Sequence, residues 1–167
     1  MPADEALRTE LVAMADADRS SRRATTDERH AARLWEILDD FECWPGRRLV
    51  GDDGAEAAWR LAQHALFDPG LQRRCLEMLE VAVDTGDAPA GHHAVLLDRV
   101  RMADGRNQVY GSQFVRSDDG TTVVPFTIDD PVGVDDRRRR VGLPPLAEQT
   151  RAMQARYADA LRTERSR

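Results

Sequence analysis

The sequence predicts a mainly α-helical fold, a helical domain of five to seven helices with one β-hairpin packed against it. Apolar residues recur at helical spacing through most of the chain, Pro and Gly interrupt that spacing at short intervals, and a single region is rich in β-branched and aromatic residues. A chain of 167 residues is long enough for one core. We therefore expect a single globular domain over 1–167, with frayed ends near 1–3 and 163–167.

Two amphipathic helices are expected first. Apolar residues at helical spacing predict a helix over 3–19. Thr25 followed by Glu28 is a capping-box pattern and predicts the start of a second helix. The apolar stripe of that second helix consists of Ala31, Leu34, Trp35, Leu38 and Phe41.

A third helix is expected over 55–66. Trp44-Pro45-Gly46 breaks the preceding helix, and the turn from Gly51 to Gly54 leads into the new one, with Asp52 or Asp53 as its N-cap. Backbone amides at a helix start can also bind an anion, so this turn has a second interpretation as a phosphate or carboxylate site.

The next two helices are bounded by turn residues. Asp68-Pro69-Gly70 ends the third helix and opens a fourth, and Asp104-Gly105 ends a fifth over 92–103. Apolar residues nearly encircle the fifth helix, so we expect it to be buried on two sides.

The β-hairpin is expected between 108 and 128. Gln108–Arg116 and Thr121–Ile128 are rich in Val, Thr, Tyr and Phe, and a four-residue loop joins them. A short helix over 135–141 and a final helix from Pro145 or Leu146 complete the expected order.

The composition excludes several classes of function. A formal charge of −6 and a pI near 5.2 argue against a general nucleic-acid binder, which needs a coherent basic surface. All 24 basic residues are arginine, which excludes chemistry that depends on a lysine of this chain, such as a Schiff base or a P-loop.

The expected location is the cytoplasm. No window approaches the length of a transmembrane helix, the first residues are acidic where a signal peptide is basic, and two cysteines cannot form a disulfide framework. We expect no membrane association, no cofactor and no metal, because the four histidines form neither an HxxxH nor an HExxH pair.

Several segments together resemble an uncharacterised bacterial family of domains that is common in actinobacteria. The segments are Leu49-Val50-Gly51 to Gly54-Ala55, Gln63-His64-Ala65 with Asp68-Pro69, Leu97-Asp98-Arg99, Gln108 with Tyr110-Gly111-Ser112-Gln113, and Val141-Gly142-Leu143-Pro144-Pro145-Leu146. The resemblance covers roughly 7–148. It implies kinship and no mechanism, and it leads us to expect a threonine in the family at the position of Ser112.

His64 and Asp98 are the candidate catalytic residues. Imidazole titrates near neutrality and can act as a general acid or base. The alternative is an ordinary surface histidine, because His64 lies nearly opposite the Ala58, Ala62 and Ala65 stripe. Asp98 lies on an apolar face, where a carboxylate needs a partner, and an internal ion pair that only fixes packing is its alternative.

The candidate substrate-binding residues are polar groups near these two: Gln63, Arg99, Gln108, Tyr110 and Gln113. In a strand, Gln108 and Tyr110 share one face and can contact a ligand together. The run Arg137–Arg140 can hold phosphates, but the acidic residues just before it favour mutual neutralisation.

Two functions agree with these observations. One is a small cofactor-independent acid–base enzyme acting on a small polar substrate in a cleft that contains His64 and Asp98. The other is a non-catalytic module for protein interaction or regulation, in which the hairpin edge and the arginine run contact a partner protein.

Overall fold

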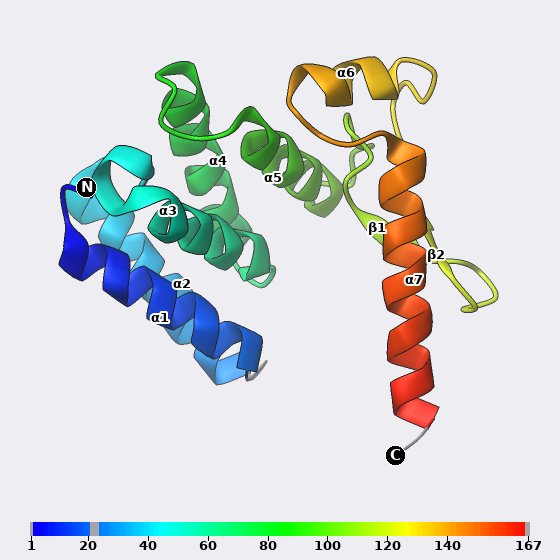
Figure 1. The fold of residues 1–167 in the computed structure, drawn as a ribbon, viewed down its shortest axis with the longest axis horizontal. Helices are drawn as coiled ribbons and strands as arrows, with labels where there is room; N and C mark the ends of the chain where they lie inside the picture. The colour runs from blue at the N-terminus through cyan, green and yellow to red at the C-terminus, as the bar shows by residue number, and fades with distance from the viewer. Residues whose placement is uncertain (1, 21–23, 166–167) are drawn as a thin grey trace. The chain divides into compact units, whose positions relative to one another are not determined.

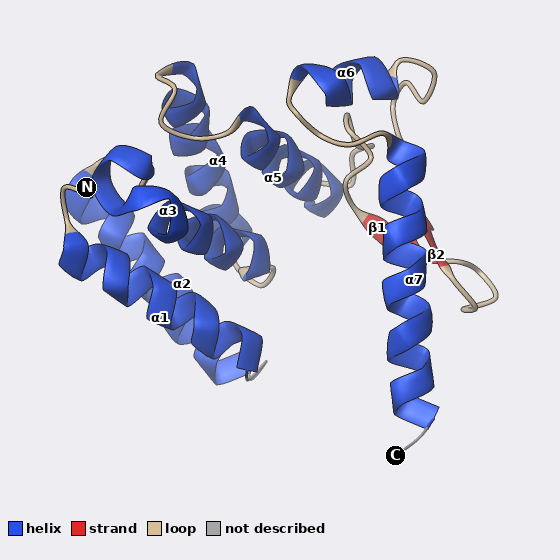
Figure 2. Cartoon of the chain, in the orientation of Figure 1, coloured by secondary structure: helices blue, strands red, loops and turns tan. Residues whose placement is uncertain are grey.

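The computed structural model describes residues 2–20 and 24–165. In these residues the chain forms seven α-helices and one two-stranded antiparallel sheet, so the expected fold class is confirmed (Figure 1 and Figure 2). The chain divides into two compact units, unit 1 (Met1–Leu96) and unit 2 (Leu97–Arg167). The expectation of a single domain stays a prediction.

The described secondary structure of unit 1 consists of α-helices. Its elements are α1 (Glu5–Ser20), α2 (Ala24–Phe41), α3 (Arg47–His64), α4 (Pro69–Asp84) and the first half of α5 (Ala90–Ala103). Helix α1 packs along α3, and α2 contacts α1, α3 and α4 (Figure 1). Fully buried side chains from these helices form the core: Leu11, Leu34, Ile37, Leu38, Val50, Leu71 and Leu79.

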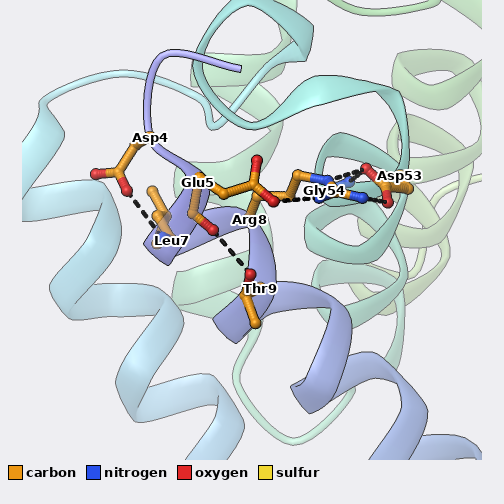
Figure 3. Close-up of polar contacts among 7 residues, drawn as sticks. All are labelled: Asp4, Glu5, Leu7, Arg8, Thr9, Asp53 and Gly54. Carbon is orange, nitrogen blue, oxygen red and sulfur yellow. Dashed lines mark hydrogen bonds and ion pairs between the residues drawn. The ribbon is translucent and has the colours of Figure 1, made fainter. Parts of the chain in front are cut away.

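The starts of α1 and α2 depend on different residues from those expected. Asp4 caps α1, because its Oδ1 accepts a hydrogen bond from the Leu7 amide at 2.9 Å (Figure 3). Helix α2 already includes Ala24, so Thr25 lies inside the helix and the prediction that it is the N-cap was wrong. Residues 21–23 and the side chain of Thr25 lie outside the described part of the chain.

Helix α3 is longer than expected and is kinked. It begins at Arg47 and not at Ala55, and Gly51 interrupts it with a φ of 71°. Only glycine adopts this left-handed conformation without strain, so the predicted turn lies between two helical segments. The Asp87 Oδ1 atom accepts a hydrogen bond from the Arg48 amide at 2.8 Å and so satisfies the first turn of α3.

Helix α4 begins where the sequence predicts it. The Asp68 Oδ1 atom accepts a hydrogen bond from the Leu71 amide at 2.9 Å, and Pro69 occupies the first turn. The Trp35 indole donates to Asp68 Oδ2 at 2.9 Å, so one carboxylate both caps α4 and fixes it to α2.

Unit 2 combines helices with the short sheet. It contains the second half of α5, β1 (Phe114–Arg116), β2 (Val123–Pro125), α6 (Val134–Arg140) and α7 (Leu146–Arg165). In the antiparallel sheet that β1 and β2 form, Val115 is paired with Val124. Helix α7 packs against β2, and the Gln154 side-chain amide donates to the Val123 carbonyl at 3.1 Å.

The hairpin is shorter than expected at its outer ends. Residues 108–113 form no strand apart from one isolated bridge between Gln108 and Ile128, and the second strand is limited to 123–125. Helices α6 and α7 begin within a residue of their predicted starts, and α7 remains helical through Arg165, beyond the point where fraying was expected to begin.

Membrane-spanning helices are absent from the described residues, because none of the helices there combines sufficient length with sufficient apolar character.

Candidate functional site

His64 is paired with a buried carboxylate on a neighbouring helix. It is the last residue of α3, and its side chain is 41% exposed. Its Nδ1 atom contacts Oδ2 of Asp18, near the end of α1, whose side chain is only 6% exposed. The side chain of His64 is therefore neither buried nor a free surface group, since one ring nitrogen is held by a carboxylate.

Two residues of α2 complete a cluster of four ionisable side chains, which we call the His64 cluster: Asp18, Asp27, His30 and His64. Asp27 and Asp18 both line the same small void. Burial, followed by an interaction with the Asp18 carboxyl group, raises the pKa of Asp27 above its usual range. The Asp27 carboxyl group therefore retains its proton to a higher pH than an isolated aspartate does.

The His64 cluster contains buried polar atoms whose bonding is incomplete. In the part of the chain that the structure describes, Asp27 Oδ1 and His30 Nδ1 have no hydrogen-bond partner. The cluster surrounds a void of about 10 Å³, which is about the space of one water molecule. Unpaired buried polar atoms are costly, and such atoms beside a void are a reason to look for a functional site there.

Three of these residues lie at the ends of the apolar stripes of their helices, and the sequence analysis did not identify them. Asp18 continues the apolar stripe of α1 by one step, four residues after Met14. Asp27 and His30 extend the stripe of α2 in the same way, before Ala31 and Leu34. Polar side chains that take core positions at helix ends are candidates for a shared polar site.

Asp27→Asn is expected to stabilise the protein at neutral pH. The raised pKa of Asp27 means that the folded state binds a proton which the unfolded state releases above pH 3.8, so stability falls as the pH rises through that window. An asparagine avoids this penalty. Thermal unfolding should show a gain at pH 7 that fades as the pH approaches 3.8.

Asp40→Asn, an exposed change near the end of the same helix, is the control for Asp27→Asn and should leave the melting temperature nearly unchanged at both pH values. A loss of stability in Asp27→Asn at pH 7 would contradict a raised pKa of Asp27.

Asp98 lies in unit 2 and is fully buried. Its Oδ1 atom accepts hydrogen bonds from the amides of Val109 at 2.7 Å and Tyr110 at 3.1 Å. Its Oδ2 atom accepts from the amide and the hydroxyl of Ser112, each at 2.9 Å. These contacts favour a role in shaping the 108–113 loop, and a pairing of Asp98 with His64 of unit 1 stays a prediction.

Gln108 and Gln113 close the same loop. The fully buried side chain of Gln108 donates to the carbonyls of Gln113 at 3.1 Å and Phe126 at 2.8 Å. Its Oε1 atom accepts from the Gln113 amide at 2.6 Å, and the Gln113 side chain donates to Ser112 Oγ at 3.1 Å. The side chains of Gln108 and Gln113 thus form hydrogen bonds within and beside the loop, and their role in binding a substrate stays a prediction.

Tyr110 and Gly111 do not occupy the strand that was expected. Gly111 has a φ of 65°, and a Cβ atom at this position would lie 2.7 Å from Ile128 Cδ1. The Tyr110 carbonyl accepts a hydrogen bond from the fully buried guanidinium of Arg138 at 2.7 Å. The loop therefore has a positive-φ turn where a strand would continue, and the predicted shared face of Gln108 and Tyr110 was wrong.

Gln63 and Arg99 belong to different units of the chain, as His64 and Asp98 do. Gln63 is buried in unit 1, where its carbonyl lies 3.5 Å from the side-chain nitrogen of Gln72 on α4. Arg99 belongs to unit 2, and burial lowers the pKa of its guanidinium. A common substrate-binding role for these two residues stays a prediction.

One protein-family model matches almost the whole chain. Residues 3–162 match the family model described as Family of unknown function (DUF6624). The chain belongs to the DUF6624 family. No curated protein and no solved structure matches the chain.

In this DUF6624 chain the turn before Ala55 is occupied by an internal ion pair. The Asp53 carboxylate accepts from the Gly54 amide at 2.9 Å and from the Arg8 Nε atom at 2.7 Å (Figure 3). Glu5 contacts the same guanidinium. The carboxylate of Asp53 thus takes the place of an external anion, which favours the structural interpretation of this turn.

The arginine run of α6 is also paired internally. Arg137 pairs with Asp130 at 2.8 Å, and Arg139 pairs with Asp136 at 2.8 Å. Arg138 is buried and donates to the Pro144 carbonyl at 2.6 Å. Neutralisation by nearby acidic residues, the favoured interpretation of this run, agrees with these contacts.

His92 and His93 diverge, as their adjacent positions on a helix predict. His92 Nε2 lies 3.2 Å from the Glu56 carboxylate, and its ring stacks on Trp59 with centroids 4.2 Å apart. Burial lowers the pKa of both imidazoles, and the charges that act on His93 are those of Glu80 and Asp84 instead. Across residues 2–20 and 24–165, no three His, Cys, Asp or Glu side chains are grouped to hold a metal ion.

Proposed function

We propose that this chain is an acid–base catalyst for a small polar substrate, with His64 as the proton-transferring group and Asp18 as its orienting partner. One observation carries the proposal: a partly exposed imidazole is held at one nitrogen by a carboxylate that is almost completely buried. This is the arrangement in which histidine is most effective as a general base.

The geometry supports a definite division of roles. An ionised Asp18 accepts a hydrogen bond from His64 Nδ1, which places the ring proton on Nδ1 and the free lone pair on Nε2. Nε2 then takes a proton from the substrate, and the Asp18 carboxylate stabilises the imidazolium that forms. Asp27, which holds a proton at higher pH than an isolated aspartate, can donate a hydrogen bond to the nearby Asp18 carboxylate in this arrangement.

In this proposal Asp18 takes the role that the sequence had suggested for Asp98. Asp18 contacts His64 directly, whereas the oxygens of Asp98 accept hydrogen bonds from Val109, Tyr110 and Ser112. The proposed reaction uses no cofactor and no nucleic acid. Its proposed setting is the reducing cytoplasm, in keeping with the free thiols of Cys43 and Cys75.

The tautomer of His64 tests this assignment. At a pH where the imidazole is neutral, its ¹⁵N chemical shifts should report a proton on Nδ1 and an unprotonated Nε2. In Asp18→Asn, the population should move toward the Nε2-protonated form, because a neutral amide favours the Nδ1-protonated form less strongly. His93 serves as the internal control, since it does not belong to the His64 cluster.

A wild-type His64 that carries its proton on Nε2 would refute the assignment, as would an Asp18→Asn spectrum identical to that of the wild type.

A further inference from the structure

A second hollow in unit 1 lies toward the other end of α2 from the His64 cluster. Its volume is about 390 Å³. Phe41 at its wall lies eleven residues after His30, which at 1.5 Å per residue is about 16 Å along the helix. The hollow is therefore a separate feature of unit 1, and a ligand bound there is independent of the role of His64.

The walls of this hollow are mostly apolar. They come from the end of α2, the connection to α3, the start of α3 and the end of α4: Phe41, Trp44, Leu49, Met78, Val81 and Ala82. Phe41 is 37% exposed and Val81 is 64% exposed. A concave apolar surface of this volume is typical of sites for small organic molecules.

Charged groups at the hollow favour a cationic ligand. Glu42 and Asp87 are the two acidic residues in its lining, and one oxygen of Asp87 accepts from the Arg48 amide. Among the described residues that line it, the single guanidinium is that of Arg48, which donates to the Thr85 carbonyl at 2.6 Å. Glu42 is held at a φ of 51°, and it is the only non-glycine residue with a positive φ in the described part of the chain. Such backbone conformations are uncommon and occur more often at binding sites.

We propose that this hollow binds a small molecule with an apolar body and one cationic nitrogen. The apolar body lies against Met78 and Val81, and the nitrogen lies close to the carboxylates of Glu42 and Asp87. Each carboxylate attracts a cation and repels an anion of the same shape, so the charge of the ligand decides its affinity.

A thiol in the lining provides the measurement. Cys43 is exposed and lines the hollow, whereas Cys75 is fully buried, so iodoacetamide modifies Cys43 selectively in the folded protein. The probes are 3-phenylpropylamine and 3-phenylpropionate, which share one apolar body and differ in charge. The amine should slow alkylation of Cys43 at concentrations about tenfold lower than the acid requires.

Two variants make the result specific. Glu42→Gln should reduce the preference for the amine severalfold. Val81→Lys places a cation at an exposed position of the lining and should abolish protection by the amine, while Val132→Lys, at a position that is 96% exposed in unit 2, should leave protection unchanged. Protection is expressed relative to the uninhibited rate of each variant, which removes direct effects on the thiol.

Three results would each overturn the proposal: neither probe slows alkylation of Cys43, the acid protects as well as the amine, or Val81→Lys is protected like the wild type.

Discussion

Asp98→Ala is expected to destabilise the protein by about 3–5 kcal/mol, the range for breaking a buried charged network. The change leaves the amides of Val109, Tyr110 and Ser112 and the Ser112 hydroxyl without their acceptor in a buried site. The loss should appear as a lower midpoint in urea unfolding. Hydrogen exchange should accelerate first at residues 109, 110 and 112.

Asp98→Asn separates shape from charge in this experiment. The amide retains one oxygen acceptor but presents an NH₂ group to donors, so it should recover only part of the lost stability. Asp118→Ala, in the exposed loop between β1 and β2, should change stability by less than about 0.5 kcal/mol. Unchanged unfolding in Asp98→Ala would show that the loop does not depend on this carboxylate.

His64→Gln is expected to lower acid–base activity by about 10²–10⁴-fold, the usual contribution of one positioned acid–base group. The measurement is the hydrolysis of 4-nitrophenyl acetate, in which Nε2 takes a proton from the attacking water and the ester releases 4-nitrophenolate and acetate. Because the His64 side chain is partly exposed, the melting temperature should change little. Asp18→Asn should lower the rate as well, since the imidazole loses its orienting carboxylate.

His93→Gln is the matched control for His64→Gln, because His93 is a half-buried histidine of α5 and is not one of the residues of the His64 cluster. It should retain the wild-type rate. Equal rates for His64→Gln and the wild type would remove His64 from the proposed chemistry.

The helices were predictable because their signals are local. Asp68 and Pro69 define the start of α4 by contacts within one turn, and the apolar spacing of α2 reflects the face that it buries. The start of α3 was missed for the opposite reason. Its first turn is satisfied by Asp87, which is 39 residues away from Arg48 in the sequence.

The 108–113 loop shows how a strand pattern can mislead. It belongs to the segment Gln108–Arg116, whose Val, Tyr and Phe residues are typical of a strand. Asp98, however, offers acceptors to three amides of the loop, and these amides no longer need a neighbouring strand. The Gly111 turn then excludes an extended path. The residue types of the segment predicted a strand, and this prediction took no account of the Asp98 carboxylate, which binds the same amides.

His64 was identified from its chemistry, but its partners were not. Asp18 is 46 residues away in the sequence, and its contact with His64 depends on how α1 packs along α3. Periodicity describes which face of a helix is buried and contains no information about which helix lies opposite. The His64 cluster therefore required the tertiary structure.

Helix α7 has a consequence for how copies of this protein meet in a concentrated solution. A two-stranded ribbon has unpaired carbonyls and amides along its margins, and these can recruit a strand from another molecule and start an aggregate. The amide of Gln154 bonds to the carbonyl of Val123, and the Tyr157 hydroxyl bonds to the carbonyl of Gly120. Because these carbonyls already accept hydrogen bonds from α7, fewer acceptors remain for a strand of another molecule. The two-stranded sheet is therefore less able to extend into an intermolecular sheet.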